Sequence, residues 1–273
     1  MFRKFICSYI EVGMSDKEEI KSHIQMPKFL LKRFHNERNK FFYYDVIRKF
    51  IGNNGTAESI NTELGYYSDT IEKIFCKEIE NPFGDLVAYL DKLEFEKVTL
   101  VLKDSVNNKK IYSIARDFLY ALICRSPSFL EKMVSEDPFF QQLSEQEQHG
   151  YVAIKGIEIA KENEIFSDYI ITFLINRTNV PFVLPVCGIY NYLFDNKMTM
   201  NLPVSPQLAL CFMHKSSSDR IIHNNGEISM FEINDSYIVF RMNQWAFSAQ
   251  IKQKWGYVVC PQKDELERLM NAN

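Results

Sequence analysis

The chain has 273 residues, of which 46% are hydrophobic and 14% aromatic, and its formal net charge is −3 at pH 7. This length suits one large domain or two small ones, and the composition excludes a disordered protein. The acidic balance excludes a general coat of positive charge for nucleic acid. No apolar run approaches the ~18 residues that a membrane span needs, and the N-terminus lacks the apolar core of a signal peptide.

The cysteines lie far apart in the sequence and form no Cys-x-x-Cys pair, so a zinc ribbon has no support and no metal site is predicted. They are Cys7, Cys76, Cys124, Cys187, Cys211 and Cys260. Most of them sit in apolar runs, which predicts buried free thiols in a reducing compartment. We therefore expect a cytoplasmic protein without membrane contact.

The first half of the chain reads mainly as helices. A short helix is expected at 29–34 after Pro27, a strand at 41–45 and a turn at 53–55. Apolar spacing then predicts helices at 70–79, 83–93, 109–124 and 129–134. Ser144 and Glu147 have the spacing of a capping box and should begin a long helix that ends near residue 163.

The second half changes character. Short β-prone runs broken by proline predict strands at 168–175, 181–187, 198–204, 207–213 and 255–260. Asn225-Gly226 is typical of a hairpin turn, and helices are expected at 238–249 and 263–270. The prediction is an α+β fold in which a mainly helical N-terminal part packs against a small mixed or antiparallel sheet formed largely by the C-terminal part. We expect a single domain over 1–273, helix-rich at 1–165 and sheet-containing at 166–273, that shares one core.

Basic residues gather near the start of the chain. The segment Lys28–Lys49 holds seven basic residues against two acidic ones, a surplus of five. Such a patch suits phosphates or an acidic partner, and it equally suits a solvated face. Lys28, Lys32 and Arg33 are the candidate binding residues within it.

His23, Pro27, Leu31 and Phe34 have the spacing His-x-x-x-Pro-x-x-x-Leu-x-x-Phe, and a tyrosine-rich strand follows them. Further motifs are Glu72 with Glu80 on a middle helix, Arg125-Ser-Pro127, Leu202-Pro-Val-Ser-Pro206 and Asn243. The order of these motifs resembles the bacterial domain-of-unknown-function family 4238. The resemblance implies a cytosolic bacterial protein, and its relatives are often encountered near mobile elements and defence loci, which suits an effector or a toxin.

The sequence departs from the family pattern at one place. Where the family carries Thr-Ser-Asp-x-Pro, this chain reads Phe182-Val-Leu-Pro-Val-Cys187, so the hydroxyls and the carboxylate at 184–186 are missing. If that aspartate performs chemistry in relatives, this chain has lost it or uses another acid.

Four residues are the candidates for catalysis. His23 offers an imidazole that works as an acid or base near neutral pH, or it holds the proline turn in place. Arg125 either grips a phosphate or pairs with Glu72 or Glu80 as a buried ion pair. The two glutamates share a helical face, where they suit a divalent metal or face solvent. Asn243 is a weaker binding candidate that suits a structural tie.

The sequence contains no cofactor motif such as Gly-x-Gly-x-x-Gly or a Walker A sequence. Two functions remain open. The first is an effector or toxin of a bacterial defence or toxin–antitoxin system, acting on a phosphate-bearing substrate that is a nucleic acid or a nucleotide. The second is a non-catalytic interaction subunit of a defence complex, docked to a protein or nucleoprotein partner that regulates it. The sequence leaves open whether the protein is an enzyme.

Overall fold

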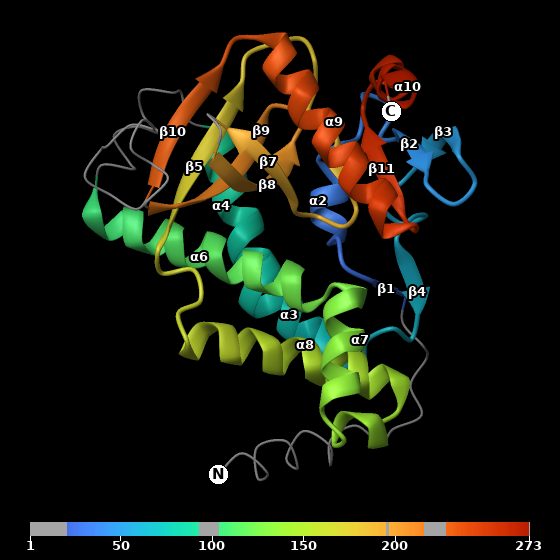
Figure 1. The fold of residues 1–273 in the computed structure, drawn as a ribbon, viewed down its shortest axis with the longest axis vertical. Coiled ribbons are helices and arrows are strands. Elements are labelled where there is room, and N and C mark those ends of the chain that lie inside the picture. Colours follow the sequence, from blue (N-terminus) through green and yellow to red (C-terminus); the bar gives the residue numbers. More distant parts are fainter. Residues whose placement is uncertain (1–20, 93–103, 195–196, 216–227, 273) are drawn as a thin grey trace.

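The computed structural model describes residues 21–92, 104–194, 197–215 and 228–272. It is an α+β fold in which a layer of helices lies beneath a five-stranded and a four-stranded sheet, with the C-terminal helices beside them (Figure 1). Cys7 and the predicted Asn225-Gly226 hairpin turn lie outside the described residues. Within the described part, no helix is long and apolar enough to cross a bilayer.

The predicted helices of the first half are present, with bounds shifted by a few residues. They are α2 (Lys28–Lys32), α3 (Asp69–Phe75), α4 (Asn81–Asp91), α6 (Ser105–Cys124), α7 (Pro127–Glu136) and α8 (Glu145–Glu162). The capping box of Ser144 and Glu147 begins α8 as expected. Between α3 and α4 the chain runs as a π-helical turn, η1 (Cys76–Glu80), a wider helix that is rare and often marks a functional position.

The larger sheet has five strands in the order β10-β5-β9-β8-β7. They are β5 (Tyr169–Asn176), β7 (Tyr190–Phe194), β8 (Lys197–Ser205), β9 (Leu208–His214) and β10 (Ile228–Ile233). Only the β10–β5 pair is parallel. Alternate residues of β5 point to opposite faces: Phe173 joins the core against the helical layer, while Leu174 packs with Val239 of helix α9 (Ser236–Gln253).

The smaller sheet has four antiparallel strands in the order β3-β2-β11-β6. They are β2 (Phe41–Asp45), β3 (Phe50–Gly55), β6 (Leu184–Pro185) and β11 (Tyr257–Cys260), and helix α10 (Lys263–Ala272) follows β11. The expected turn at 53–55 is wrong, because these residues belong to β3. The glycines there serve close packing: a Cβ on Gly52 would lie 2.2 Å from the Tyr43 ring.

The expected division into a helical first half and a sheet-forming second half is not confirmed, because helices and strands interleave. Strands β2 and β3 come from the N-terminal region and pair with β11 near the C-terminus. A further pair, β1 (Lys21–His23) with β4 (Thr62–Leu64), also lies in the first half. The sequence pattern missed β1, β3 and β4 because they are short, polar or rich in glycine.

The segment at 181–187 is less regular than the predicted strand. Only Leu184 and Pro185 pair as β6. On either side of them, side-chain amides of α9 form the hydrogen bonds to the backbone that a neighbouring strand would otherwise form. The Val183 amide donates to Asn243 Oδ1 (3.1 Å), and the Cys187 amide donates to Gln250 Oε1 (2.7 Å). This exchange satisfies backbone donors that would otherwise be buried without a partner.

Candidate functional site: a buried arginine cluster and an open pocket

The predicted catalytic residues meet in one cluster around Arg125, which follows α6 as its C-cap. Its Nη1 donates to Glu80 Oε1 (2.6 Å), and its Nη2 donates to the backbone carbonyl of His23 (2.8 Å). The guanidinium also lies 5.1 Å from the ring centre of Tyr67 and 4.5 Å from that of Phe75. The side chains of Arg125 and Glu80 are only 2% and 12% exposed, so this is a buried ion pair, one of the two alternatives for Arg125.

The two glutamates of the cluster differ. Glu80 closes the π-helical turn and holds Arg125. Glu72 lies on α3, and burial raises the pKa of its carboxyl, although nearby Arg125 and a hydrogen bond with Ser22 oppose this. Glu72 Oε1 and Arg125 Nε are buried and have no hydrogen-bond partner among the described residues. The cluster therefore holds one carboxylate that is paired with Arg125 and one whose pKa is raised by burial.

His23 joins the cluster through its backbone, because its ring is engaged elsewhere. Its Nε2 lies 2.7 Å from the carbonyl of Ala57. Burial lowers the pKa of His23 and keeps the ring neutral near pH 7, while the bond to Ala57 acts in the opposite sense. This ring ties β1 to the loop after β3, so its hydrogen bond goes to Ala57 and not to the turn at Pro27 that the structural alternative named.

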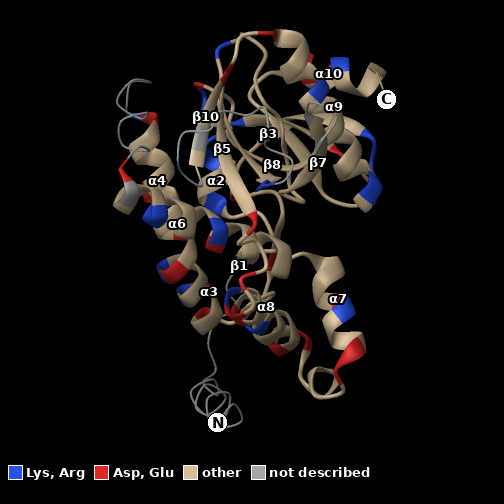
Figure 2. Cartoon of the chain, turned by 60° about the vertical axis from the view of Figure 1, so that its left-hand side comes forward, with Lys and Arg blue, Asp and Glu red and all other residues tan. Residues whose placement is uncertain are grey.

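The predicted binding residues lie in different places. Lys28 and Lys32 are exposed and reach Glu58, at 3.0 and 3.7 Å, so part of the basic surplus is neutralised. Figure 2 shows Lys and Arg interspersed with Asp and Glu over the helices. Asn243 is buried, and its Nδ2 donates to the carbonyl of Pro181 and to Glu265, both at 2.8 Å.

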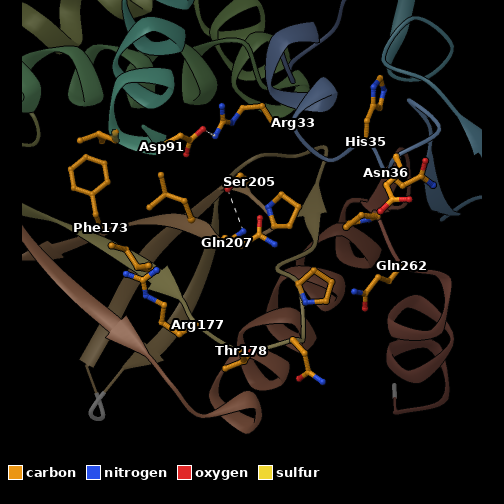
Figure 3. A pocket seen from close by; sticks show the side chains of 18 of the residues that line it. Arg33, His35, Asn36, Asp91, Phe173, Arg177, Thr178, Ser205, Gln207 and Gln262 are labelled. Carbon is orange, nitrogen blue, oxygen red and sulfur yellow. Dashed lines mark hydrogen bonds and ion pairs between the residues drawn. The ribbon is translucent and has the colours of Figure 1, made fainter. Parts of the chain in front are cut away.

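Arg33 lines an open pocket of about 880 Å³, where the end of α2, the end of α4, the larger sheet and the loop after β11 meet (Figure 3). Such a volume suits a ligand of nucleotide or drug size. Apolar side chains of the sheet form part of its wall, and amides and hydroxyls form much of the remainder. The polar lining residues are Arg33, His35, Asn36, Glu37, Asp91, Arg177, Thr178, Asn179, Ser205, Gln207 and Gln262.

Two arginines of the pocket are held in place by partners on one side. Arg33 donates through Nε to the carbonyl of Val204 (2.7 Å) and through Nη2 to Asp91. Arg177 donates through Nε to Glu232 (2.7 Å). Within the described part of the chain, these bonds leave Nη1 of Arg33 and both Nη atoms of Arg177 for another acceptor. The His35 ring points away from the pocket's centre in Figure 3 and packs on Phe41.

The sequence had singled out only part of this pocket. Arg33 was a predicted binding residue, and Ser205-Pro206 belongs to the motif that resembles family 4238. Asn243 supports the wall from behind by holding Pro181, which lines the pocket. Arg177, Gln207 and Gln262 carried no signal, because each is a single polar residue in a loop or at a strand end.

Comparisons with protein-family models, with curated proteins and with solved structures found no match to this chain. The resemblance to family 4238 therefore remains a prediction. Among the described residues, no group of three or more histidine, cysteine, aspartate or glutamate side chains is placed to hold a metal ion.

Proposed function

We propose that this protein binds a small phosphate-bearing ligand in the pocket beside Arg33 and Arg177. The observation that carries the proposal is that two guanidinium groups line one ligand-sized pocket and keep donors outside their ion pairs. A guanidinium fixed by a carboxylate on one side presents a rigid pair of donors on the other, which matches phosphate oxygens.

The wider role in this proposal is that of a cytoplasmic effector or toxin in a bacterial defence or toxin–antitoxin system. It rests on the resemblance to family 4238. The free, buried thiols of Cys124, Cys187, Cys211 and Cys260 suit a reducing compartment. In this proposal His23, Glu72, Glu80 and Arg125 maintain the fold that shapes the pocket, because their polar groups are largely buried or already paired.

The test is calorimetric titration of the full chain with nucleotides and with inorganic phosphate. Arg177→Gln should weaken binding by about tenfold or more, because hydrogen bonds to charged groups contribute about 1.5–3 kcal/mol. Arg241→Gln is the matched control, since Arg241 is exposed on α9 and contacts Gln244 outside the pocket. The proposal fails if no phosphate compound binds, or if both variants bind as the wild type does.

A second candidate function is supported by the β2–β3 hairpin. At its tip Ile47 is 70% exposed and Phe50 is 40% exposed. Arg48 and Lys49 lie between them, and the Asp45 carboxylate is turned inward, where its Oδ1 accepts from the amides of Ile47 and Arg48. A tip on which two cations lie between two apolar side chains suits an acidic surface of a protein partner, as an interaction subunit requires.

The hairpin reading is tested with paired variants. Ile47→Asp should abolish a complex with such a partner, and Arg48→Glu should weaken it more at low salt than at high salt. Ile165→Asp changes another exposed isoleucine, 53% accessible, and should leave the complex intact. A complex that survives Ile47→Asp and Arg48→Glu contradicts the hairpin as the docking site.

A further inference from the structure

The charges that line the pocket are balanced, which limits what it accepts. Arg33 and Arg177 supply two positive charges, and Glu37 and Asp91 supply two negative ones. Glu232, the partner of Arg177, adds a further carboxylate nearby. The pocket therefore offers directed donors without a surplus of positive charge.

Directed donors without surplus charge favour a ligand with few negative charges. One phosphate can take the two remaining Nη donors of Arg177, and Arg33 lies apart from it on the pocket wall (Figure 3). Each further phosphate of a di- or triphosphate would bring negative charge to a site whose cations are already paired, close to Glu37 and Asp91. Sites for triphosphates instead supply extra cations or a metal ion to offset that charge.

The remainder of the lining suits an uncharged, flat, hydrogen-bonding group. Ile175 and Met230 give partly buried apolar surface from the sheet, next to Arg177. Asn179, Gln207 and Gln262 place amides around the same pocket, and each amide both donates and accepts. A nucleobase has this character, with an apolar face and donors and acceptors on its edge.

We infer that the ligand is a nucleoside that carries a single phosphate, with the phosphate on Arg177 and the base against the sheet and the amides. This inference rests on the proposed function and narrows it. The same chemistry comes from two sources, a free nucleoside monophosphate or the phosphorylated end of a nucleic acid strand.

The experiment is a calorimetric panel on the full chain in metal-free buffer. It compares AMP, GMP, CMP and UMP with the corresponding nucleosides, with the triphosphates, and with an oligonucleotide bearing a 5′-phosphate or a 5′-hydroxyl. At least one monophosphate, or the 5′-phosphorylated strand, should bind about tenfold or more tightly than its nucleoside or 5′-hydroxyl counterpart. It should also bind more tightly than its triphosphate. Preference for the phosphorylated strand identifies the strand end as the source, and preference for the monophosphate identifies the free nucleotide.

Other outcomes separate the two proposals. If triphosphates bind as tightly as monophosphates, the single-phosphate inference is overturned while phosphate binding in the pocket stands. If inorganic phosphate and every nucleotide fail to bind, both are overturned. If nucleosides bind as tightly as monophosphates, the arginines do not contribute to binding through the phosphate, and both proposals are contradicted.

A charge variant tests the reason for the preference. Glu37→Gln removes one lining carboxylate and should shift the ratio of triphosphate to monophosphate affinity about fivefold or more toward the triphosphate. Glu136→Gln, on α7 and outside the pocket, is the control and should leave that ratio unchanged. An unchanged ratio in Glu37→Gln contradicts the charge argument even if monophosphates bind best.

Discussion

An arginine side chain has a different role in each of the two polar regions of this molecule, the cluster around Arg125 and the pocket beside Arg177. The Arg125 side chain is 2% exposed and is enclosed by Glu80, a backbone carbonyl and two aromatic rings. Arg177 pairs with Glu232 at a similar distance, yet its side chain is 47% exposed at the edge of a pocket. The comparison shows that burial, more than pairing, decides whether an arginine holds a fold together or is accessible to a ligand.

The largest expected effect is at Arg125. Arg125→Met should lower the free energy of unfolding by about 3–5 kcal/mol, because it leaves the Glu80 carboxylate buried without its partner. Urea unfolding measures this loss. The double variant Arg125→Met with Glu80→Leu removes both charges and should recover much of the stability. Equal losses in the single and double variants would show that the pair itself is not the cause.

The two glutamates should respond in opposite ways. Glu80→Gln should destabilise the protein at pH 7 by a few kcal/mol, because it removes the charge that offsets Arg125. Glu72→Gln should be neutral or stabilising at pH 7. The folded pKa of Glu72 is raised above 4.5, so its contribution is full at low pH and is lost as the pH rises through the folded value. The free energy of unfolding, measured from pH 4 to pH 8, should therefore change less with pH in Glu72→Gln than in the wild type.

His23 should give a smaller effect of the opposite sign. Its folded pKa lies below the ordinary value of 6.5, so the unfolded chain takes up the proton first. Stability is therefore gained above pH 6.5 and declines as the pH falls below it. His23→Gln should reduce this decline between pH 7.5 and pH 5.5, as measured by urea unfolding at each pH. A decline identical to that of the wild type would assign it to other groups.

The smallest expected change in stability is in the pocket. Arg177→Gln should alter the free energy of unfolding by less than about 1 kcal/mol, because pairs this exposed contribute little. The same urea measurement that detects Arg125→Met checks this value. A loss comparable to that of Arg125→Met would erase the distinction between the two regions.

The sequence predicted the helices well and the pocket poorly, for physical reasons. Helices such as α6 and α8 carry their signals within one segment, as apolar spacing and a capping box. The cluster around Arg125 could be predicted in part, because the resemblance named its members and the ion pair was one of two alternatives.

The pocket depends on how distant segments meet. Arg33, Arg177 and Gln262 come from three segments far apart in the chain, and no local pattern encodes that meeting. The wrong prediction of a turn at 53–55 has a related cause. Gly52 and Gly55 leave room for the rings of Phe41 and Tyr43 on the neighbouring strand. Local turn chemistry alone therefore misassigned them.

The amides of α9 have a consequence for how this protein can change over generations. Asn243 and Gln250 grip the peptide groups of Pro181, Val183 and Cys187, and they do not grip the side chains. Apolar substitutions at 184–186 therefore leave the attachment intact, whereas a carboxylate there would be buried, because Leu184 and Val186 are both 0% exposed. Substituting Asn243 or Gln250 would instead remove the hydrogen bonds that hold the segment.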